Sequence, residues 1–155
     1  MRREELYIET SVWNFLLAGD EPARKASTIA FFKQNTHGAL FVSELVIDEI
    51  IRSPELKRVS LTEEIRRVNP VVLMETAEVV ELANEYVRRA IFPVRFTADA
   101  LHVAYASYYN VTAIISWNLR HIVKVKTRLE DRAANIVLGY STPEIATPEE
   151  YTDGI

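Results

Sequence analysis

Short runs of apolar residues alternate along the chain with longer stretches in which apolar side chains recur at helical spacing. The short runs cover residues 6–8, 39–42, 71–73 and 113–116. Continuous apolar runs of this length are typical of strands that are buried on both faces of a sheet. The spacing of apolar residues between them predicts helices over residues 10–17, 23–35, 44–51, 55–68, 75–90 and 98–109.

The last third of the chain has a weaker pattern. A basic run suggests a short helix, and its members are Lys124, Lys126, Arg128 and Arg132. An apolar run over residues 136–138 follows. Segments 141–144 and 147–150 have similar sequences that contain proline and Ser or Thr, and we predict both as turns.

Strands that are separated by helices predict an α/β protein. We expect a single domain over residues 1–155, built as three α/β/α layers around a central, mostly parallel sheet. A chain of 155 residues with 48% hydrophobic residues can bury a sizeable core. Sheets of this kind bind ligands at the carboxyl ends of their strands, close to the point where the strand order reverses.

Composition excludes several classes of function. The formal net charge of −4 predicts no overall attraction to nucleic acid, although a local basic face remains open. The absence of cysteine excludes disulfides, thiolate zinc sites and cysteine nucleophiles. No glycine-rich phosphate loop, GxSxG motif or HExxH motif occurs. The charged N-terminus and the lack of a long apolar run predict no signal peptide and no membrane partner, so we expect a cytoplasmic protein.

Four polar residues fall close to the predicted strand ends or at a helix start: Glu9, Glu49, Asp99 and Asn118. Taken singly, each has an ordinary interpretation. An acid is favoured in the first turn of a helix, and asparagine is common in turns. Taken together, three carboxylates and one amide predict a site for a hard cation, Mg²⁺ or Mn²⁺, because these ions prefer oxygen ligands.

Other polar residues near these four leave alternatives open. Ser116 could orient an attacking water, hold a ligand or cap the following turn. His102 lies on the same side of its helix as Asp99, so it could bind zinc or iron together with His121, or it could be a hydrogen-bonded structural residue. Three basic residues could meet phosphates or form a solvated basic face: Arg120, Lys124 and Lys126.

The ordered set of motifs resembles the PIN-domain family. The motifs are Tyr-Ile-Glu-Thr-Ser-Val over residues 7–12, Val-Ser-Glu-Leu-Val-Ile-Asp-Glu-Ile over 42–50, Asp-Ala-Leu-His-Val-Ala over 99–104 and Ser-Trp-Asn-Leu-Arg-His over 116–121. The segment 147–150 is similar to the usual close of such domains. The chain resembles in particular a branch of the family with Glu-Thr-Ser and Trp-Asn-x-Arg-His motifs.

This resemblance implies Mg²⁺- or Mn²⁺-dependent ribonuclease activity, as in the VapC-type toxins of toxin–antitoxin pairs. Position by position, the four acidic places of the family fall on Glu9, Glu49, Asp99 and Asn118, and Ser116 falls where a Thr or Ser commonly helps the site. Two places depart from the family pattern. The first place is usually Asp, and the fourth place is often Asp, so the site's formal charge falls from −4 to −3.

We therefore expect an endoribonuclease with RNA as its substrate, and as a toxin it would have a cognate antitoxin protein. The two departures leave open a catalytically weak or inactive module that binds RNA or protein. A zinc or iron hydrolase is a third interpretation. By the same resemblance we expect a homodimer, for which apolar surface could come from Trp13, Phe15 and Leu16, although burial of these side chains in the core is at least as good an interpretation.

Overall fold

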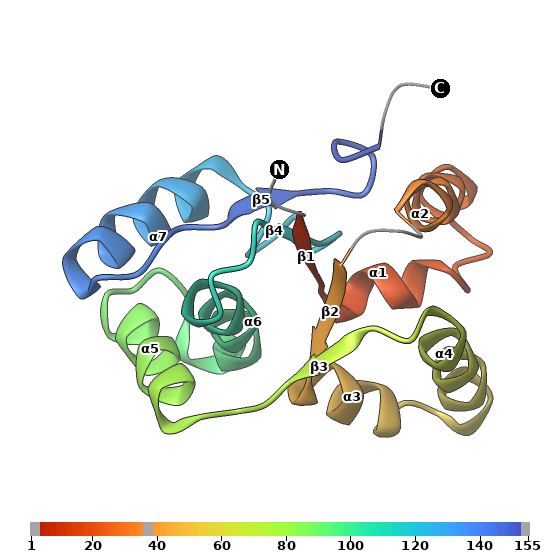
Figure 1. Ribbon diagram of the computed structural model, residues 1–155, viewed down its shortest axis with the longest axis horizontal. Helices are drawn as coiled ribbons and strands as arrows, with labels where there is room; N and C mark the ends of the chain where they lie inside the picture. The colour runs from red at the N-terminus through yellow and green to blue at the C-terminus, as the bar shows by residue number, and fades with distance from the viewer. Residues whose placement is uncertain (1–3, 36–38, 153–155) are drawn as a thin grey trace.

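Five parallel strands form the centre of the protein in the computed structural model, which describes residues 4–35 and 39–152 (Figure 1). The strands are β1 (Glu5–Ile8), β2 (Ala39–Ser43), β3 (Val71–Leu73), β4 (Ala113–Ile115) and β5 (Glu144–Ala146). Their order in the sheet is β3-β2-β1-β4-β5. All four pairings are parallel, which confirms the predicted parallel sheet.

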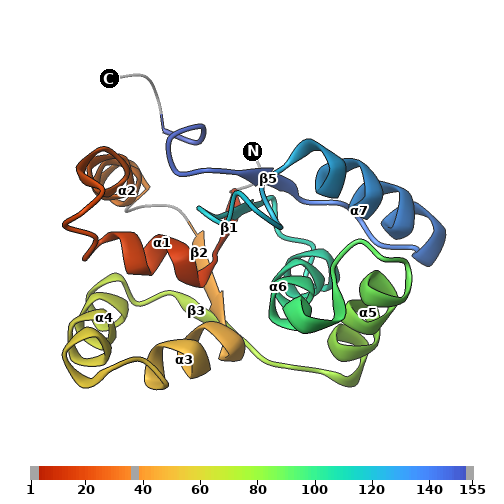
Figure 2. The same ribbon diagram turned by 180° about the vertical axis from the view of Figure 1, so that it is seen from behind.

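Helices cover both faces of this sheet. In chain order they are α1 (Thr10–Phe15), α2 (Pro22–Gln34), α3 (Glu44–Ile51), α4 (Glu55–Val68), α5 (Ala77–Arg88), the 3₁₀ turn η1 (Val94–Phe96), α6 (Thr97–Tyr108) and α7 (Val125–Leu138). Figures 1 and 2 show α1, α2 and α4 on one side of the strands and α5, α6 and α7 on the other, with α3 beyond the end of β2. This is the predicted three-layer α/β/α architecture.

The strand order reverses next to β1. The chain forms β1, β2 and β3 in one direction and then crosses over β1 to form β4 and β5 on the other side. Leu6 pairs with both Leu40 of β2 and Ala113 of β4, so β1 lies at the middle of the sheet. A crevice at the carboxyl ends of β1 and β4 is therefore the place where this architecture presents a site.

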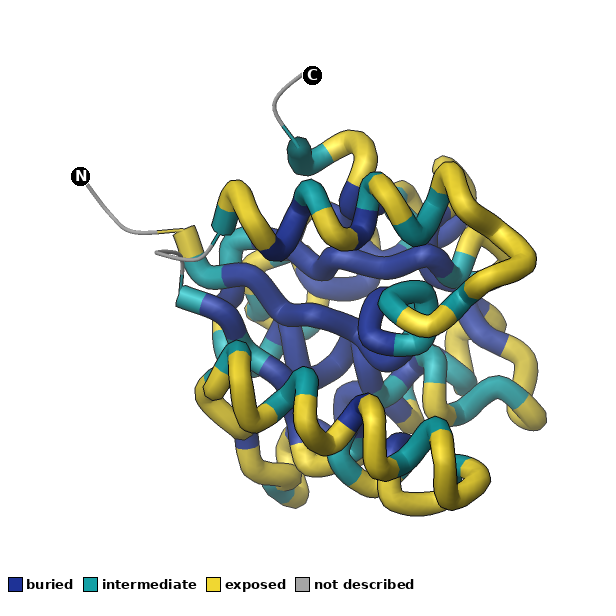
Figure 3. The backbone as a smooth tube through the Cα atoms, turned by 90° about the vertical axis from the view of Figure 1, so that its right-hand side faces the viewer, coloured by how far each residue is buried: buried dark blue, intermediate teal, exposed yellow. Residues whose placement is uncertain are grey.

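The core lies along β1 and β4, as Figure 3 shows by the dark blue strands beneath exposed helix surfaces. All three residues of β4 are fully buried, as expected for a central strand covered on both faces. Trp13 is also fully buried, whereas Phe15 and Leu16 are half-buried and pack against the core. Trp13 therefore cannot supply dimer surface, and the predicted homodimer stays a prediction without that residue.

Three local predictions were wrong. The segment 141–150 contains a fifth strand, because residues 144–146 pair with β4 between the two expected turns. The basic run and residues 136–138 form one 14-residue helix, α7, in which Ile136 and Val137 are exposed. The helix predicted over residues 98–109 begins one residue earlier, at Thr97, whose hydroxyl donates to the Val94 carbonyl, and Phe96 is its N-cap.

None of the helices in the described part of the chain is long and apolar enough to cross a membrane. The prediction that residues 1–155 form a single domain stays a prediction.

Candidate active site

Glu9 follows β1 directly and caps the N-terminus of α1. The backbone N–H of Glu9 donates to the Ile115 carbonyl at 3.0 Å, which extends the pairing of β1 with β4 by one residue. The side chain is 5% exposed. Its Oε1 accepts hydrogen bonds from the Ser11 and Ser116 hydroxyls, both at 2.6 Å, and its Oε2 accepts from the Ser11 N–H at 3.1 Å. Three protein donors therefore hold this buried carboxylate.

Glu49 lies on α3, and its Oε1 also accepts two hydrogen bonds. The Thr10 hydroxyl and His102 Nε2 each lie 2.7 Å from this oxygen. Burial alone would raise the pKa of Glu49, but the hydrogen bond and charge of His102 and the bond from Thr10 lower it on balance. Glu49 is thereby held as a carboxylate at the end of β2.

His102 is buried between two of the acids. Its Nδ1 lies 2.7 Å from the Tyr7 hydroxyl, and its Nε2 lies 2.7 Å from Glu49 Oε1 and 3.8 Å from Glu9 Oε2. Burial lowers the pKa of His102, but the hydrogen bond with Glu49 and the charges of Glu9 and Glu49 outweigh burial and raise it. Because both ring nitrogens have protein partners, His102 has no nitrogen left for zinc or iron.

Asp99 lies in the first turn of α6 and faces Asn118 in the turn after β4. Asp99 Oδ1 accepts a hydrogen bond from Asn118 Nδ2 at 3.0 Å, and Asn118 Oδ1 accepts from the His121 N–H at 3.1 Å. Burial raises the pKa of Asp99, and the negative charge of Glu9 raises it further. Glu9 and Asp99 therefore repel each other, and Asn118 contacts Asp99 through its amide nitrogen.

Ser116 joins the end of β4 to this site. Its hydroxyl donates to Glu9 Oε1 and accepts the Asn118 N–H at 2.9 Å. The single hydroxyl proton is directed to Glu9, so Ser116 positions the carboxylate and caps the following turn at the same time. In this arrangement its proton is not directed to a water.

In two of the three carboxylates, one oxygen accepts hydrogen bonds from the protein and the other oxygen accepts none from the described residues. Within the described residues, no hydrogen-bond donor contacts Glu49 Oε2 or Asp99 Oδ2. Glu9 is held on both oxygens, but its Oε2 has only the 3.1 Å bond from a backbone N–H. Carboxylates fastened in this way keep their orientation and still offer lone pairs to a ligand.

The side chains are not arranged for three of them to coordinate one metal ion directly. Among residues 4–35 and 39–152, no three His, Asp or Glu side chains are placed to hold one ion. Mg²⁺ is commonly held by one or two carboxylates, with waters filling its other positions. The donor set, which consists of carboxylate oxygens with open lone pairs, fits a hydrated Mg²⁺ or Mn²⁺ and does not fit a zinc site.

The sequence analysis missed the residues that support the acids. Thr10 and Ser11 were given no role in the site, yet the Thr10 hydroxyl donates to Glu49 and the Ser11 hydroxyl donates to Glu9. Tyr7 was assigned to the core, and its hydroxyl also lies 2.7 Å from the Ser43 hydroxyl. Tyr7 could have been identified from the sequence, because its hydroxyl is the one polar side-chain atom in a buried apolar run and therefore needs a hydrogen-bond partner.

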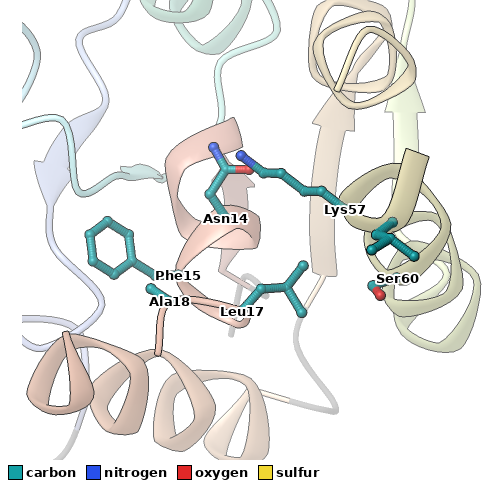
Figure 4. Close-up of a pocket in the computed structure, with 7 residues that line it drawn as sticks. Asn14, Phe15, Leu17, Ala18, Lys57 and Ser60 are labelled. Atoms are coloured by element: carbon teal, nitrogen blue, oxygen red, sulfur yellow. The ribbon is translucent and has the colours of Figure 1, made fainter. Parts of the chain in front are cut away.

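One surface pocket lies away from the acids. It is an open groove of about 600 Å³ between α1 and α4, and Figure 4 shows its lining. The lining residues are Asn14, Phe15, Leu17, Ala18, Leu56, Lys57 and Ser60. No carboxylate lines this groove, so we do not assign the chemistry to it.

The fold and the site together define an α/β protein with an acidic cluster at the switch point of a parallel sheet. A family model described as PIN domain matches residues 6–126. The chain therefore belongs to the PIN-domain family.

Two solved structures have a similar fold. VapC20 from Mycobacterium tuberculosis, described as a Sarcin-Ricin loop cleaving toxin, is 23% identical over 70% of this chain and 86% of its own, with a TM-score of 0.54. VapBC2 from Rickettsia felis, solved bound to a DNA fragment from its promoter, is 11% identical over 92% of this chain and 98% of its own, with a TM-score of 0.56. A search of curated proteins found no match.

Proposed function

We propose that this protein is a divalent-metal-dependent endoribonuclease that hydrolyses RNA phosphodiesters at the acidic cluster. One observation supports this proposal most strongly. Protein donors hydrogen-bond to Glu9, Glu49 and Asp99, while one oxygen of Glu49 and one of Asp99 accept no hydrogen bond from the described residues. A structural role would not require three acids to repel one another in a half-buried crevice. Membership of the PIN-domain family supports the same activity.

Each residue of the site has a distinct task in this proposal. Glu49 and Asp99 would bind Mg²⁺ or Mn²⁺ through their open oxygens, and Glu9 would contribute Oε2. Ser116 holds Glu9, and Asn118 orients Asp99, so both act as positioning residues. The family position of Asn118 suggests a ligand, but its amide oxygen already accepts the His121 N–H, which favours the positioning role.

A bound Mg²⁺ or Mn²⁺ would supply a Lewis acid that activates water and offsets charge on the phosphate. Burial raises the pKa of Asp99, and the negative charge of Glu9 raises it further, so the carboxylates repel one another without a cation. Mn²⁺ should therefore stabilise the fold, by about 2.7 kcal/mol at a hundred times Kd. Thermal unfolding across a millimolar Mn²⁺ series measures this effect. A melting temperature that does not change with Mn²⁺ in either the wild type or Asp99→Asn contradicts the metal site.

Cleavage of RNA gives the direct test of the activity. In the presence of Mn²⁺, the wild type should cut RNA oligonucleotides, and Asp99→Asn should be slower by about a hundredfold or more, because loss of Lewis-acid stabilisation costs several kcal/mol. Asp48→Asn is the matched control, since Asp48 is an exposed neighbour of Glu49 that pairs with Arg52. Equal rates in Asp99→Asn and wild type would remove the proposed active site.

One observation favours a second function. His102 lies between Glu9 and Glu49, and no three acids or histidines in the described residues are placed to hold an ion. A PIN-domain module that binds RNA or protein without cleaving it would have this arrangement. Binding of RNA without Mn²⁺-dependent cleavage, unchanged by Asp99→Asn, would favour the module.

The partners follow from the same proposal. VapC20 is described as a toxin, and VapBC2 as a complex on promoter DNA, so we propose that this chain is the toxin of a toxin–antitoxin pair. A small DNA-binding protein encoded by the neighbouring gene, and a stable complex on co-expression, would support an antitoxin. Homodimerisation is a further part of this proposal, and the molar mass in solution measures it.

A further inference from the structure

The outward face of α7 is apolar, although a helix that borders solvent normally exposes polar side chains. Its exposed large aliphatic residues are Val125, Leu129, Ile136 and Val137, at 65%, 63%, 73% and 70%. Together with the exposed Ala133 they recur every three or four residues, so they form one stripe, called the α7 stripe below. The residues that α7 buries lie on the opposite face, so the stripe points away from the core. No other helix in the described part of the chain exposes more than two large apolar side chains.

Positive charge on α7 is confined to its N-terminal end and its middle. The exposed cations are Lys124, Lys126 and Arg132. Within the described residues, no acid is at ion-pair distance from Lys124 or Arg132, and Lys126 has only a 3.9 Å contact with Glu130. After Arg132 the helix has no charged residue, and its C-terminus is the negative end of the helix dipole.

An acidic groove lies at the C-terminal end of α7, between this helix and α5. Its volume is about 370 Å³, and its lining includes Glu78, Glu81, Leu82, Glu85, Leu138 and Tyr140. Arg88 pairs with Glu81 and Glu85, but no cation in the described residues pairs with Glu78. α7 has 14 residues and is therefore about 21 Å long. The cations at its start cannot reach the groove at its end within one copy of the chain.

We propose that the α7 stripe is the interface of a homodimer in which two α7 helices pack antiparallel about a two-fold axis. The antiparallel direction places the cationic end of each α7 beside the acidic groove of the other copy, whereas a parallel direction would bring the cations of both copies together. Val125 then lies opposite Ile136 of the partner subunit. Leu129 lies opposite Ala133 of the partner subunit, and this small side chain lets the helices approach closely. An apolar centre with a charged rim is the usual anatomy of such an interface.

This inference rests on the homodimer of the proposed function and specifies the surface that forms it, and it does not depend on nuclease activity. It assigns to α7 the apolar dimer surface that the sequence analysis expected around α1. The two surfaces are on different helices, so substitutions can test them separately.

Leu129→Gln tests the α7 stripe through the molar mass in solution. Leucine and glutamine have similar helix propensities, and Leu129 is exposed in one copy, so the folded monomer should keep its stability. Because of the two-fold axis, the substitution removes two leucines from each dimer, and the dimer dissociation constant should rise by about a hundredfold or more. Leu56→Gln is the matched control, because Leu56 is 87% exposed on α4, outside the proposed interface. Sedimentation equilibrium over a concentration series measures all three proteins.

Paired cysteines test the direction of the helices. The natural chain has no cysteine, so Val125→Cys and Ile136→Cys introduce the only thiols. Along one helix these positions are about 17 Å apart, which is too far for a disulfide within one chain. On mild oxidation the protein with both substitutions should form a covalent dimer, seen in a denaturing gel without reductant. Each single variant should stay uncrosslinked, because identical positions lie about 17 Å apart across the two-fold axis.

The outcomes separate this inference from the proposed function. A dimer whose dissociation constant is the same in Leu129→Gln and wild type would overturn the α7 interface and leave the homodimer intact. A wild type that is monomeric at every concentration would contradict both, without bearing on the nuclease. If that monomer bound a co-expressed partner protein and Leu129→Gln abolished the binding, the stripe would be an interface for that protein and not for a second copy. Crosslinking of the single variants would contradict the antiparallel direction. A lower melting temperature of monomeric Leu129→Gln with an unchanged dissociation constant would assign Leu129 to stability and would also overturn the interface.

Discussion

Two buried polar regions of this protein differ in the hydrogen bonding of their carboxyl groups. At the carboxyl ends of the strands, serine and threonine hydroxyls donate to Glu9 and Glu49. Beneath α7, the side chains of Tyr86, Ser107 and Asn135 form a closed ring of hydrogen bonds, called the polar ring below. The neighbouring Asp131 lies outside this ring.

The polar ring uses its own donors completely. The Tyr86 hydroxyl donates to Asn135 Oδ1 at 2.5 Å, the Asn135 amide donates to Ser107 Oγ at 3.0 Å, and the Ser107 hydroxyl lies 3.1 Å from the Tyr86 oxygen. Asp131 is fully buried, and neither of its oxygens has a hydrogen-bond partner within the described residues. Burial raises the pKa of Asp131 to about 7, and the nearby Tyr86 hydroxyl lowers it only in part.

The comparison shows that hydrogen-bond donors can outweigh burial, because His102 and Thr10 lower the pKa of the partly buried Glu49 on balance, whereas burial raises the pKa of Asp131. Glu9 is almost as buried as Asp131, but three donors contact its carboxyl oxygens. Asp131 has none, because the polar ring is satisfied without it, and the neutral acid is the form that suits an apolar site. In the proposed function, the first region offers negative charge to a metal ion, whereas burial in the second region favours the neutral acid.

The largest effect should follow from removing the ionisable group beneath α7. The folded protein keeps the Asp131 proton up to about pH 7, whereas the unfolded chain releases it near pH 4. The contribution of Asp131 is therefore fully present below about pH 4 and is lost as the pH rises to about 7. As the pH rises from 4 to 8, the free energy of unfolding of Asp131→Asn should increase relative to that of the wild type by on the order of 4 kcal/mol.

Urea unfolding at a series of pH values measures this gain. Glu130→Gln is the control, because Glu130 is the adjacent acid on α7 and is partly exposed beside Lys126. Its stability should follow the wild-type pH profile. An Asp131→Asn profile parallel to that of the wild type would show that Asp131 is ionised in the folded protein.

A smaller effect should follow from opening the polar ring. Asn135→Ala removes the acceptor of the Tyr86 hydroxyl and the donor to Ser107, and it leaves two buried hydroxyls short of partners. Unsatisfied buried groups cost about 1–3 kcal/mol each, so we expect a loss of about 3 kcal/mol. Urea unfolding at pH 5 measures it, with the exposed Asn84→Ala on α5 as a control expected to be nearly neutral. A loss below about 1 kcal/mol would mean that the ring contributes little.

The smallest effect should come from the acidic cluster. Ser116→Ala removes one of the three donors to Glu9 and the acceptor of the Asn118 N–H, and both groups keep other contacts or partial access to water. We expect a loss of about 2 kcal/mol at pH 7, as for a hydrogen bond to a charged group. Ser60→Ala, at an exposed position of α4, should be neutral. If Ser116→Ala were instead stabilising, the repulsion among the acids would dominate this region.

Most of the fold could be predicted because its strands are short apolar runs between amphipathic helices. The runs at 6–8, 39–42 and 71–73 lie within strands, and the helix predicted over 44–51 has the observed bounds. β5 could not be predicted, since three residues without a period form a strand only when β4 is there to pair with them. The length of α7 was underestimated because its burial pattern is the reverse of the usual one. The helix buries Thr127, Asp131 and Asn135 and exposes Val125, Leu129 and Ile136.

The sequence by itself determined which oxygen-bearing residues follow the central strands, since position after a buried run can be predicted from local composition. Only the tertiary structure decided what each of them contacts. Glu9 and Ser116 are more than a hundred residues apart, and their 2.6 Å hydrogen bond exists because β1 and β4 are neighbours in the sheet. The charge of a buried acid depends on such donors, which reach it from distant segments, and no local pattern encodes them.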